Sequence, residues 1–186
     1  MMSPRLPPLP PEHLSPEQSA VASAILAGPR RSLDGPFRAW LRSPVLAERL
    51  QSLGEYVRFD NVLPRRLSEL AILITARHWT AQFEWYAHHP LALAAGLDPA
   101  VAAAIAGDRE PDAMAADERA TYDFATELHR TGRVGAAAYG AALAAFGEQG
   151  VVDLIGICGY YTIVAMTLNV AEVAVPEGEA LPLAPR

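Results

Sequence analysis

Two glutamates and one histidine are the residues of this sequence best suited to acid–base chemistry. Glu84 and His88 are four residues apart, so on a helix they lie one turn apart and can contact each other. On a helical wheel both fall in the middle of an apolar arc, which predicts that they face the interior. Glu69 lies among apolar residues at helical spacing in the preceding segment. Because burying a lone carboxylate costs several kcal/mol, these groups should have partners.

The expected chemistry is proton transfer. His88 is the candidate general acid and base, Glu84 its orienting partner, and Glu69 a second proton-relay or electrostatic group. A carboxylate bonded to one ring nitrogen fixes the tautomer and raises the basicity of the other nitrogen. The alternative is a structural network in which a buried glutamate bonds Arg65 or Arg77, and the residues alone leave both interpretations open.

Substrate contacts are expected from a second group of residues. Arg77 is the candidate anchor for a substrate carboxylate, since a guanidinium can hold both carboxylate oxygens. Trp85, Phe37 and Tyr160 are candidate lining residues, although aromatic side chains at such positions often only fill a core. Cys158 is the single cysteine, and with apolar neighbours and no basic residue beside it, it is expected to pack rather than react.

Start and stop signals position these residues on helices. Ser15 with Gln18 forms a capping-box pattern, Asp98 precedes a proline, and Gly28, Gly96 and Gly107 are expected helix ends. Thr80 and Asp117 are expected as helix caps. No segment alternates like a strand. The sequence therefore predicts an all-α domain of about eight helices. They are expected over residues 16–27, 44–59, 64–78, 81–96, 99–107, 117–131, 134–146 and 150–173, with a short turn over residues 37–41.

One helical domain is expected over residues 15–178. It should follow a proline-rich arm, residues 1–14, and precede a short tail, residues 179–186. The stretch 154–171 has no formal charge and is long enough to span a membrane, but acidic residues flank it and no basic cluster does. A helix that is apolar on all sides usually lies in a core or at a subunit interface, which predicts an oligomer.

Composition excludes several classes of function. The 15 basic residues are all arginine, so lysine Schiff-base chemistry and a P-loop are excluded. A net charge of −6 argues against nucleic acid as the main partner. A lone cysteine excludes a disulfide framework, and the N-terminus lacks a signal peptide's apolar core, so a cytoplasmic setting is expected. A metal is disfavoured because His89 points away from the face of His88. No cofactor is expected.

The sequence resembles the carboxymuconolactone decarboxylase family, which includes the alkylhydroperoxidase D-like proteins. The resemblance covers about residues 35–178 and rests on the segments at 69–73, 84–88, 95–97, 159–162 and 165–169. It implies an alkylhydroperoxidase D-like all-α fold that assembles as trimers or hexamers. It also implies a link to the breakdown of aromatic acids.

The resemblance departs from the peroxidase-type members at two positions. Those members carry a Cys-x2-Cys pair between the glutamate and the histidine that match Glu69 and His88. This chain has Ala81 and Glu84 at the cysteine positions. Without that pair, dithiol peroxide reduction cannot run. The resemblance therefore implies a cofactor-free lyase or isomerase that decarboxylates a small carboxylated or lactone substrate. The alternatives are a non-catalytic helical oligomer and a hydroperoxide-reducing protein.

Overall fold

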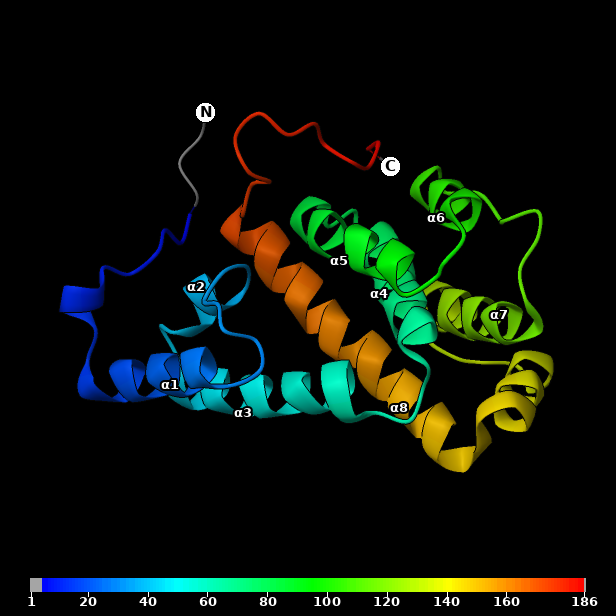
Figure 1. Cartoon of the computed structure of the whole chain (residues 1–186), viewed down its shortest axis with the longest axis horizontal. Helices are drawn as coiled ribbons and strands as arrows, with labels where there is room; N and C mark the ends of the chain where they lie inside the picture. The colour runs from blue at the N-terminus through cyan, green and yellow to red at the C-terminus, as the bar shows by residue number, and fades with distance from the viewer. Residues whose placement is uncertain (1–4, 186) are drawn as a thin grey trace.

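The structure, a computed structural model, describes residues 5–185 of the chain (Figure 1). The α-helices are α1 (Pro16–Ala27), α2 (Phe37–Trp40), α3 (Pro44–Glu55), α4 (Arg65–Trp79), α5 (Gln82–Ala94), α6 (Pro99–Ala106), α7 (Ala116–Thr131) and α8 (Ala136–Ala171). A short 3-10 turn, η1 (Pro11–His13), precedes α1, and a π-helical turn, η2 (Tyr56–Asp60), follows α3. No strand occurs in this range. The all-α prediction and the number of helices are confirmed.

Helix α4 is the centre of the fold. Every residue from 67 to 77 is buried, and α4 packs against α5, α6, α7 and α8. Polar side chains on this helix therefore need partners inside the protein. Thr75, for example, donates its hydroxyl hydrogen bond to the carbonyl of Ala71.

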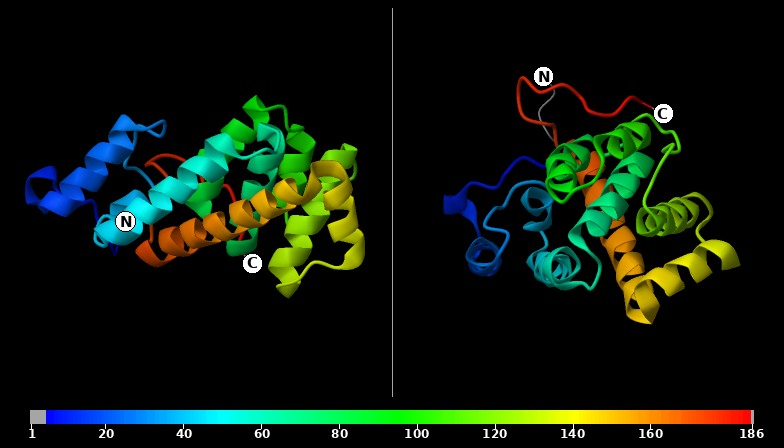
Figure 2. Two further views of the ribbon diagram at one scale, coloured as in Figure 1. Left: turned by 90° about the horizontal axis from the view of Figure 1, so that it is seen from below. Right: turned by 45° about the vertical axis from the view of Figure 1, so that its right-hand side comes forward.

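Helix α8 crosses the molecule diagonally, with α1 to α3 on one side and α4 to α7 on the other (Figures 1 and 2). It is kinked at Gly147, where φ is 68°, so the two helices predicted from the sequence are continuous across a bend. It is also long and apolar enough to span a membrane by length and composition, yet 56% of its most apolar window is buried inside the fold. Core burial therefore accounts for much of its apolar character.

The outward face of α8 carries exposed apolar side chains, among them Val152, Ile155 and Val170. Such a stripe is typical of an interaction surface. The oligomer predicted from the sequence stays a prediction.

The capping signals were interpreted correctly at α1 and α6. Ser15 accepts a hydrogen bond from the amide of Gln18 at 3.2 Å, and the Gln18 side chain accepts one from the amide of Ser15 at 2.9 Å. Asp98 accepts a hydrogen bond from the amide of Ala100 at the start of α6. These bonds satisfy amide groups that have no partner within the helix.

Two predicted caps are wrong. Thr80 does not begin α5: its φ of 49° and ψ of 41° make it the left-handed end of α4, and α5 begins after Ala81. Asp117 lies inside the first turn of α7, where Glu118 accepts the hydrogen bond from the amide of Ala115. Asp117 and Glu118 instead both pair with Arg66 on α4. Tertiary ion pairing thus overrides the local capping pattern.

The helix predicted over 44–59 is not α-helical throughout. It ends at Glu55 and widens into the π-helical turn η2. The leucines and the valine that recur along it at helical spacing are not all buried: Leu50 and Val57 are buried, whereas Leu46 and Leu53 are exposed. The helix lies at the edge of the fold, where only a narrow stripe of it meets α1 and α8.

The described parts of the two terminal segments contact the helices. Within the predicted arm, the amide of Arg5 donates to the carbonyl of Ala171 at the end of α8. The described part of the tail is held by Gln82, whose amide group bonds both the N–H and the carbonyl of Leu183. Leu183 is buried. The tail therefore contributes to the covering of α5.

Candidate active site

A cavity of about 250 Å³ lies between the loop after α1, the turn η2, α5 and α8. Its acid–base residues, Glu84 and His88, both come from α5. Its cationic residues are Arg30 and Arg58, and its phenolic residues are Tyr160 and Tyr161 on α8. The segments that build it are far apart in sequence, so the cavity is a product of the tertiary fold.

Helix α5 brings Glu84 and His88 to the cavity from one face. Glu84 is 1% exposed and His88 is 7% exposed, so both face inward as the helical wheel predicts. Ala87, expected on the same arc, is exposed at the rim of the cavity. The inward placement of the two ionisable groups therefore follows from their one-turn spacing on this helix.

The partner of His88 is Glu69, not Glu84. Nδ1 of His88 lies 2.8 Å from Oε2 of Glu69 on α4. Arg65 donates to the other oxygen of Glu69 at 3.2 Å. A carboxylate accepts hydrogen bonds, so Nδ1 carries the imidazole proton and Nε2 is left as an acceptor. The predicted orienting role of Glu84 is wrong, because the packing of α5 on α4 brings Glu69 to the ring.

His88 is suited to act as a base at neutral pH. Burial lowers its pKa, and the hydrogen bond and charge of Glu69 oppose that shift. Nε2 makes no hydrogen bond to a described residue, and His88 lines the cavity. Glu69 then stabilises the imidazolium that forms when Nε2 takes a proton.

Glu84 is suited to act as an acid. Both of its carboxyl oxygens are buried without a hydrogen-bond partner among the described residues. Burial raises its pKa well above the usual value for a glutamate. Burial of this kind favours the protonated form of a carboxyl group, which can donate a hydrogen bond or a proton. An acid and a base therefore lie one turn apart in the same cavity.

Two arginines at the cavity were not predicted from the sequence. Arg30 lies in the loop after α1 with its guanidinium 4.8 Å from the centre of the Phe37 ring, and Arg58 lies in η2. Neither forms an ion pair with a carboxylate of the described chain, and each has a buried nitrogen without a hydrogen bond. Nothing local in the sequence distinguishes these two from the other arginines; only the fold brings them to Glu84 and His88.

The two tyrosines complete the polar lining. Tyr161 meets the His88 ring edge-on, with centroids 5.0 Å apart, and Tyr160 meets Tyr161 edge-on at 5.2 Å. Both hydroxyls are buried without a hydrogen bond of normal geometry to a described residue. Burial raises the pKa of each, so both remain protonated donors. Of the predicted substrate contacts, Tyr160 is the one that lines this cavity.

Three predicted substrate contacts lie elsewhere. Arg77 donates to the carbonyl of Ala184 and lies 3.8 Å from the carboxylate of Asp108, in a different cavity. Trp85 is buried and stacks on His89. It lies about 100° around α5 from Glu84, so it faces away from the cavity. Phe37 is fully buried and packs edge-on against Trp40, where it supports Arg30 from outside the cavity.

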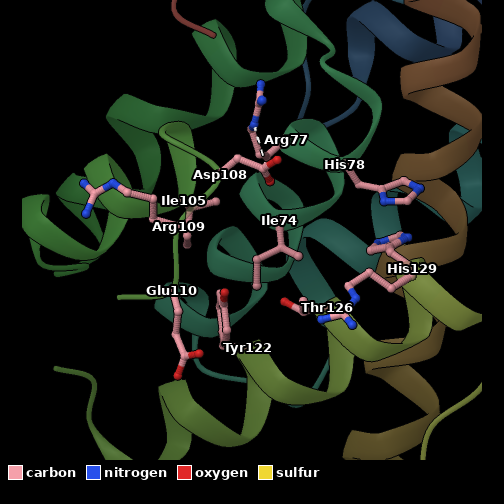
Figure 3. A pocket seen from close by; sticks show the side chains of 11 residues that line it. Ile74, Arg77, His78, Ile105, Asp108, Arg109, Glu110, Tyr122, Thr126 and His129 are labelled. Atoms are coloured by element: carbon pink, nitrogen blue, oxygen red, sulfur yellow. Dashed lines mark ion pairs between the residues drawn. The ribbon is translucent and has the colours of Figure 1, made fainter. Parts of the chain in front are cut away.

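The cavity that contains Arg77 has a volume of about 360 Å³ and is drawn in Figure 3. Its histidines, His78 and His129, stack with centroids 5.0 Å apart. Nε2 of His129 bonds the Thr75 hydroxyl, and burial together with the charge of His78 lowers the pKa of His129 to about 4. These contacts tie α4 to α7.

Thiol and metal chemistry have little support in the described residues. Cys158 is buried on α8, outside the cavity, and burial raises its pKa to about 12. No group of three His, Cys, Asp or Glu side chains in the described chain is arranged to hold a metal ion. The groups of the cavity that are suited to chemistry are the Glu84 carboxyl and the His88 imidazole, with the arginine and tyrosine hydrogen-bond donors around them.

No protein-family model matches this chain, and the search of curated proteins finds no match either. The resemblance noted in the sequence therefore rests on the residues of its motif.

Proposed function

We propose that this protein is a cofactor-free enzyme, a lyase or isomerase, that moves protons on a small anionic substrate. The observation that carries the proposal is that one cavity is lined by Glu84, a buried carboxyl group without a hydrogen-bond partner among the described residues, and by His88, whose Nδ1 is bonded to Glu69. Acid and base groups in opposite roles are what proton transfer between two atoms of a substrate requires.

The charge of the cavity favours an anion. Arg30 and Arg58 bring two positive charges that no carboxylate of the described chain neutralises, while Asp34 at the rim is already bonded to Arg38 and Ser32. A substrate carboxylate would satisfy the guanidinium groups and relieve their mutual repulsion. The volume of about 250 Å³ suits a compact organic acid.

The reaction proposed first is decarboxylation of an unsaturated lactone acid. Loss of carbon dioxide leaves an electron pair delocalised into the lactone, and a proton must then reach carbon. Glu84 supplies that proton to carbon, and the Glu84 carboxylate left behind regains a proton from solvent when the product leaves. Glu69 holds the ring in one tautomer throughout. An isomerisation uses the same two groups, with His88 removing a proton and Glu84 delivering another.

The resemblance to the carboxymuconolactone decarboxylase family agrees with this assignment. Its motif residues Glu69 and His88 form a hydrogen bond with each other, and His88 lines the cavity. We extend the resemblance to an alkylhydroperoxidase D-like fold and to assembly as a homo-oligomer, with small molecules and no nucleic acid or membrane as partners. The exposed apolar face of α8 supports the assembly. A cytoplasmic setting and a role in aromatic catabolism belong to the same proposal.

The rival proposal is a non-catalytic helical oligomer in which the three residues form a structural network. Such a network predicts polar groups that are sealed and mutually bonded. Glu84, Arg30, Arg58, Tyr160 and Tyr161 instead keep buried atoms without partners around one cavity. Unsatisfied groups of this kind cost stability and are typical of binding sites. This observation favours the enzyme.

The test is a panel of unsaturated lactone acids assayed for carbon dioxide release and, by NMR, for isomerisation. We expect turnover by the unmodified protein and a loss of about 10²–10⁴-fold in His88→Gln, as expected when a general acid–base group is removed. His89→Gln is the matched control, because His89 neighbours His88 but stacks on Trp85 outside the cavity. Equal turnover in His88→Gln and the unmodified protein would reject the proposal.

A binding assay tests the charge argument separately. Calorimetric titration with benzoate should show weaker binding in Arg30→Met by about 10-fold or more, the scale of a charged hydrogen bond. Arg109→Met provides the matched control, since Arg109 is exposed and lines the other cavity. Equal affinity in Arg30→Met and Arg109→Met would contradict the proposal that the substrate is an anion.

A further inference from the structure

The Tyr161 hydroxyl is the polar group of the cavity that packing explains least. Its side chain is 2% exposed, and its ring is held edge-on by both His88 and Tyr160. Phenylalanine would fill the same space. A buried hydroxyl without a hydrogen bond lowers the free energy of unfolding by about 1–3 kcal/mol. The Tyr161 oxygen therefore destabilises a core that does not need it for packing.

Arg58 lines the same cavity as Tyr161. Burial raises the pKa of Tyr161, and the Arg58 guanidinium is the strongest influence in the opposite direction. Burial likewise lowers the pKa of Arg58, opposed first by Tyr161. The guanidinium Nε is buried without a partner. The Tyr161 hydroxyl and the Arg58 Nε–H are thus hydrogen-bond donors without a partner, on two residues that line one cavity. We expect a bound oxygen to accept from both.

The position of this pair beside the base decides what the acceptor is. Tyr161 meets the His88 ring edge-on and both residues line the cavity, so a substrate bound there is within reach of the Tyr161 hydroxyl and the imidazole together. Removing a proton from a substrate carbon beside a carbonyl places negative charge on the carbonyl oxygen. Donors fixed in advance at such an oxygen stabilise the charge as it develops.

We propose that Tyr161 and Arg58 form an oxyanion subsite, and that the substrate is a carboxylate whose reaction passes through an enolate, such as a 2-oxo acid. This inference rests on the proposed function, because His88 must act as the base. Arg30 holds the carboxylate, and the carbonyl oxygen accepts hydrogen bonds from the Tyr161 hydroxyl and Arg58. The subsite gives Tyr161 a catalytic role.

The proton transfer balances without a further reactant. Nε2 of His88 takes a proton from carbon 3 of the 2-oxo acid, and the C–H electron pair forms the double bond between carbons 2 and 3. The carbonyl π pair moves to oxygen, which Tyr161 and Arg58 hold as the enolate. In D2O the imidazolium exchanges its proton with solvent and returns a deuteron to carbon 3, which restores the 2-oxo acid in deuterated form.

The experiment is proton NMR of pyruvate and 2-oxobutyrate in D2O with the full chain. The unmodified protein should accelerate loss of the carbon-3 proton signal over buffer, and His88→Gln should abolish the acceleration. Tyr161→Phe should lower the exchange rate by about 10²–10³-fold, the cost of removing one oxyanion donor. Its pyruvate affinity should stay within about 3-fold, because Arg30 binds the carboxylate. The control Tyr139→Phe alters an exposed tyrosine on α8 and should exchange at the original rate.

The outcomes separate this inference from the proposed function. Tyr161→Phe exchanging as fast as the unmodified protein, with His88→Gln inactive, overturns the oxyanion subsite and leaves the acid–base site intact. No exchange of either acid by the unmodified protein also overturns the subsite, while turnover of lactone acids decides the proposed function. Equal exchange in His88→Gln overturns both. Tyr161→Phe retains the packing, so its melting temperature, which should not fall, checks that it is folded.

Discussion

Glu69 on α4 and His88 on α5 join consecutive helices through one hydrogen bond, 2.8 Å from Oε2 to Nδ1, inside the core. Glu84, which is one turn from His88 on the same helix, makes no such bond. This geometry gives the two carboxyl groups different roles. Glu69 orients the imidazole, and Glu84 is left as a buried acid.

Replacing Glu69 by glutamine should lower the pKa of His88 further. Burial already lowers that pKa, and the Glu69 carboxylate is the group that opposes the shift. Removing the negative charge leaves desolvation unopposed. NMR titration of the His88 ring resonances measures the change, with His89 as an internal reference in the same spectra. A rise in the pKa of His88 in Glu69→Gln would contradict the assigned hydrogen bond.

Glu84 should make the protein less stable as the pH rises. Its pKa in the folded state is raised by burial, so above the pKa of the unfolded chain the folded state holds the extra proton. The free energy of unfolding therefore falls from about pH 5 upward, until the pH passes the raised pKa. Glu84→Gln cannot titrate, and its stability should change less over this range. Urea unfolding at several pH values measures both, and parallel curves for the two proteins would show that Glu84 is ionised in the fold.

Gly54 on α3 leaves the space that Tyr160 occupies. A Cβ atom at position 54 would lie 2.1 Å from the Tyr160 hydroxyl, so Gly54→Ala must displace the ring. We expect a loss of about 1–3 kcal/mol in the free energy of unfolding, as in other overpacked cores. Gly140→Ala is the matched control, since nothing lies within 4 Å of that Cβ and alanine favours a helix by about 1 kcal/mol.

A second substitution tests the cause of that loss. Tyr160→Leu in the Gly54→Ala background should recover stability, because the two changes act on one contact and are not additive. Thermal unfolding of the single and double variants gives the coupling. Additive losses would show that Gly54 does not make room for the tyrosine.

Cys158 should be inert in the folded protein. Burial raises its pKa to about 12, so at neutral pH the thiol is not ionised and the reactive thiolate is scarce. Ellman's reagent should label the thiol only when the chain is unfolded, and the protein should show no hydroperoxide turnover that is lost in Cys158→Ser. Rapid labelling of the native protein would contradict this prediction and favour the alternative of a hydroperoxide-reducing protein.

Much of the fold could be predicted from helix-end signals and hydrophobic periodicity. The Ser15 capping box, the Asp98 start of α6 and the inward face of α5 depend on residues close in sequence, and each was predicted correctly. Thr80 and Asp117 were misjudged because tertiary contacts and a left-handed helix end decided their conformations. The π-helical turn at 56–60 left no local signal.

The candidate site was predictable only in part, for the same reason. Glu84 and His88 could be placed inside because their helix has a clear apolar face. Which carboxyl group contacts His88 depends on how α5 packs on α4, and spacing within one helix cannot decide that. Arg77 was predicted as the carboxylate anchor because a guanidinium can hold both carboxylate oxygens, a property that every arginine shares, whereas the fold supplies Arg30 and Arg58 from segments before α4.

The claim on which the account depends most is that Glu84 is protonated beside the unprotonated Nε2 of His88 at neutral pH. Infrared difference spectroscopy of the unmodified protein against Glu84→Gln at pH 7 tests it directly. The account predicts that Glu84→Gln loses a carbonyl band of a protonated carboxylic acid. Loss of carboxylate stretching bands instead, with no change in the carboxylic acid region, would contradict it.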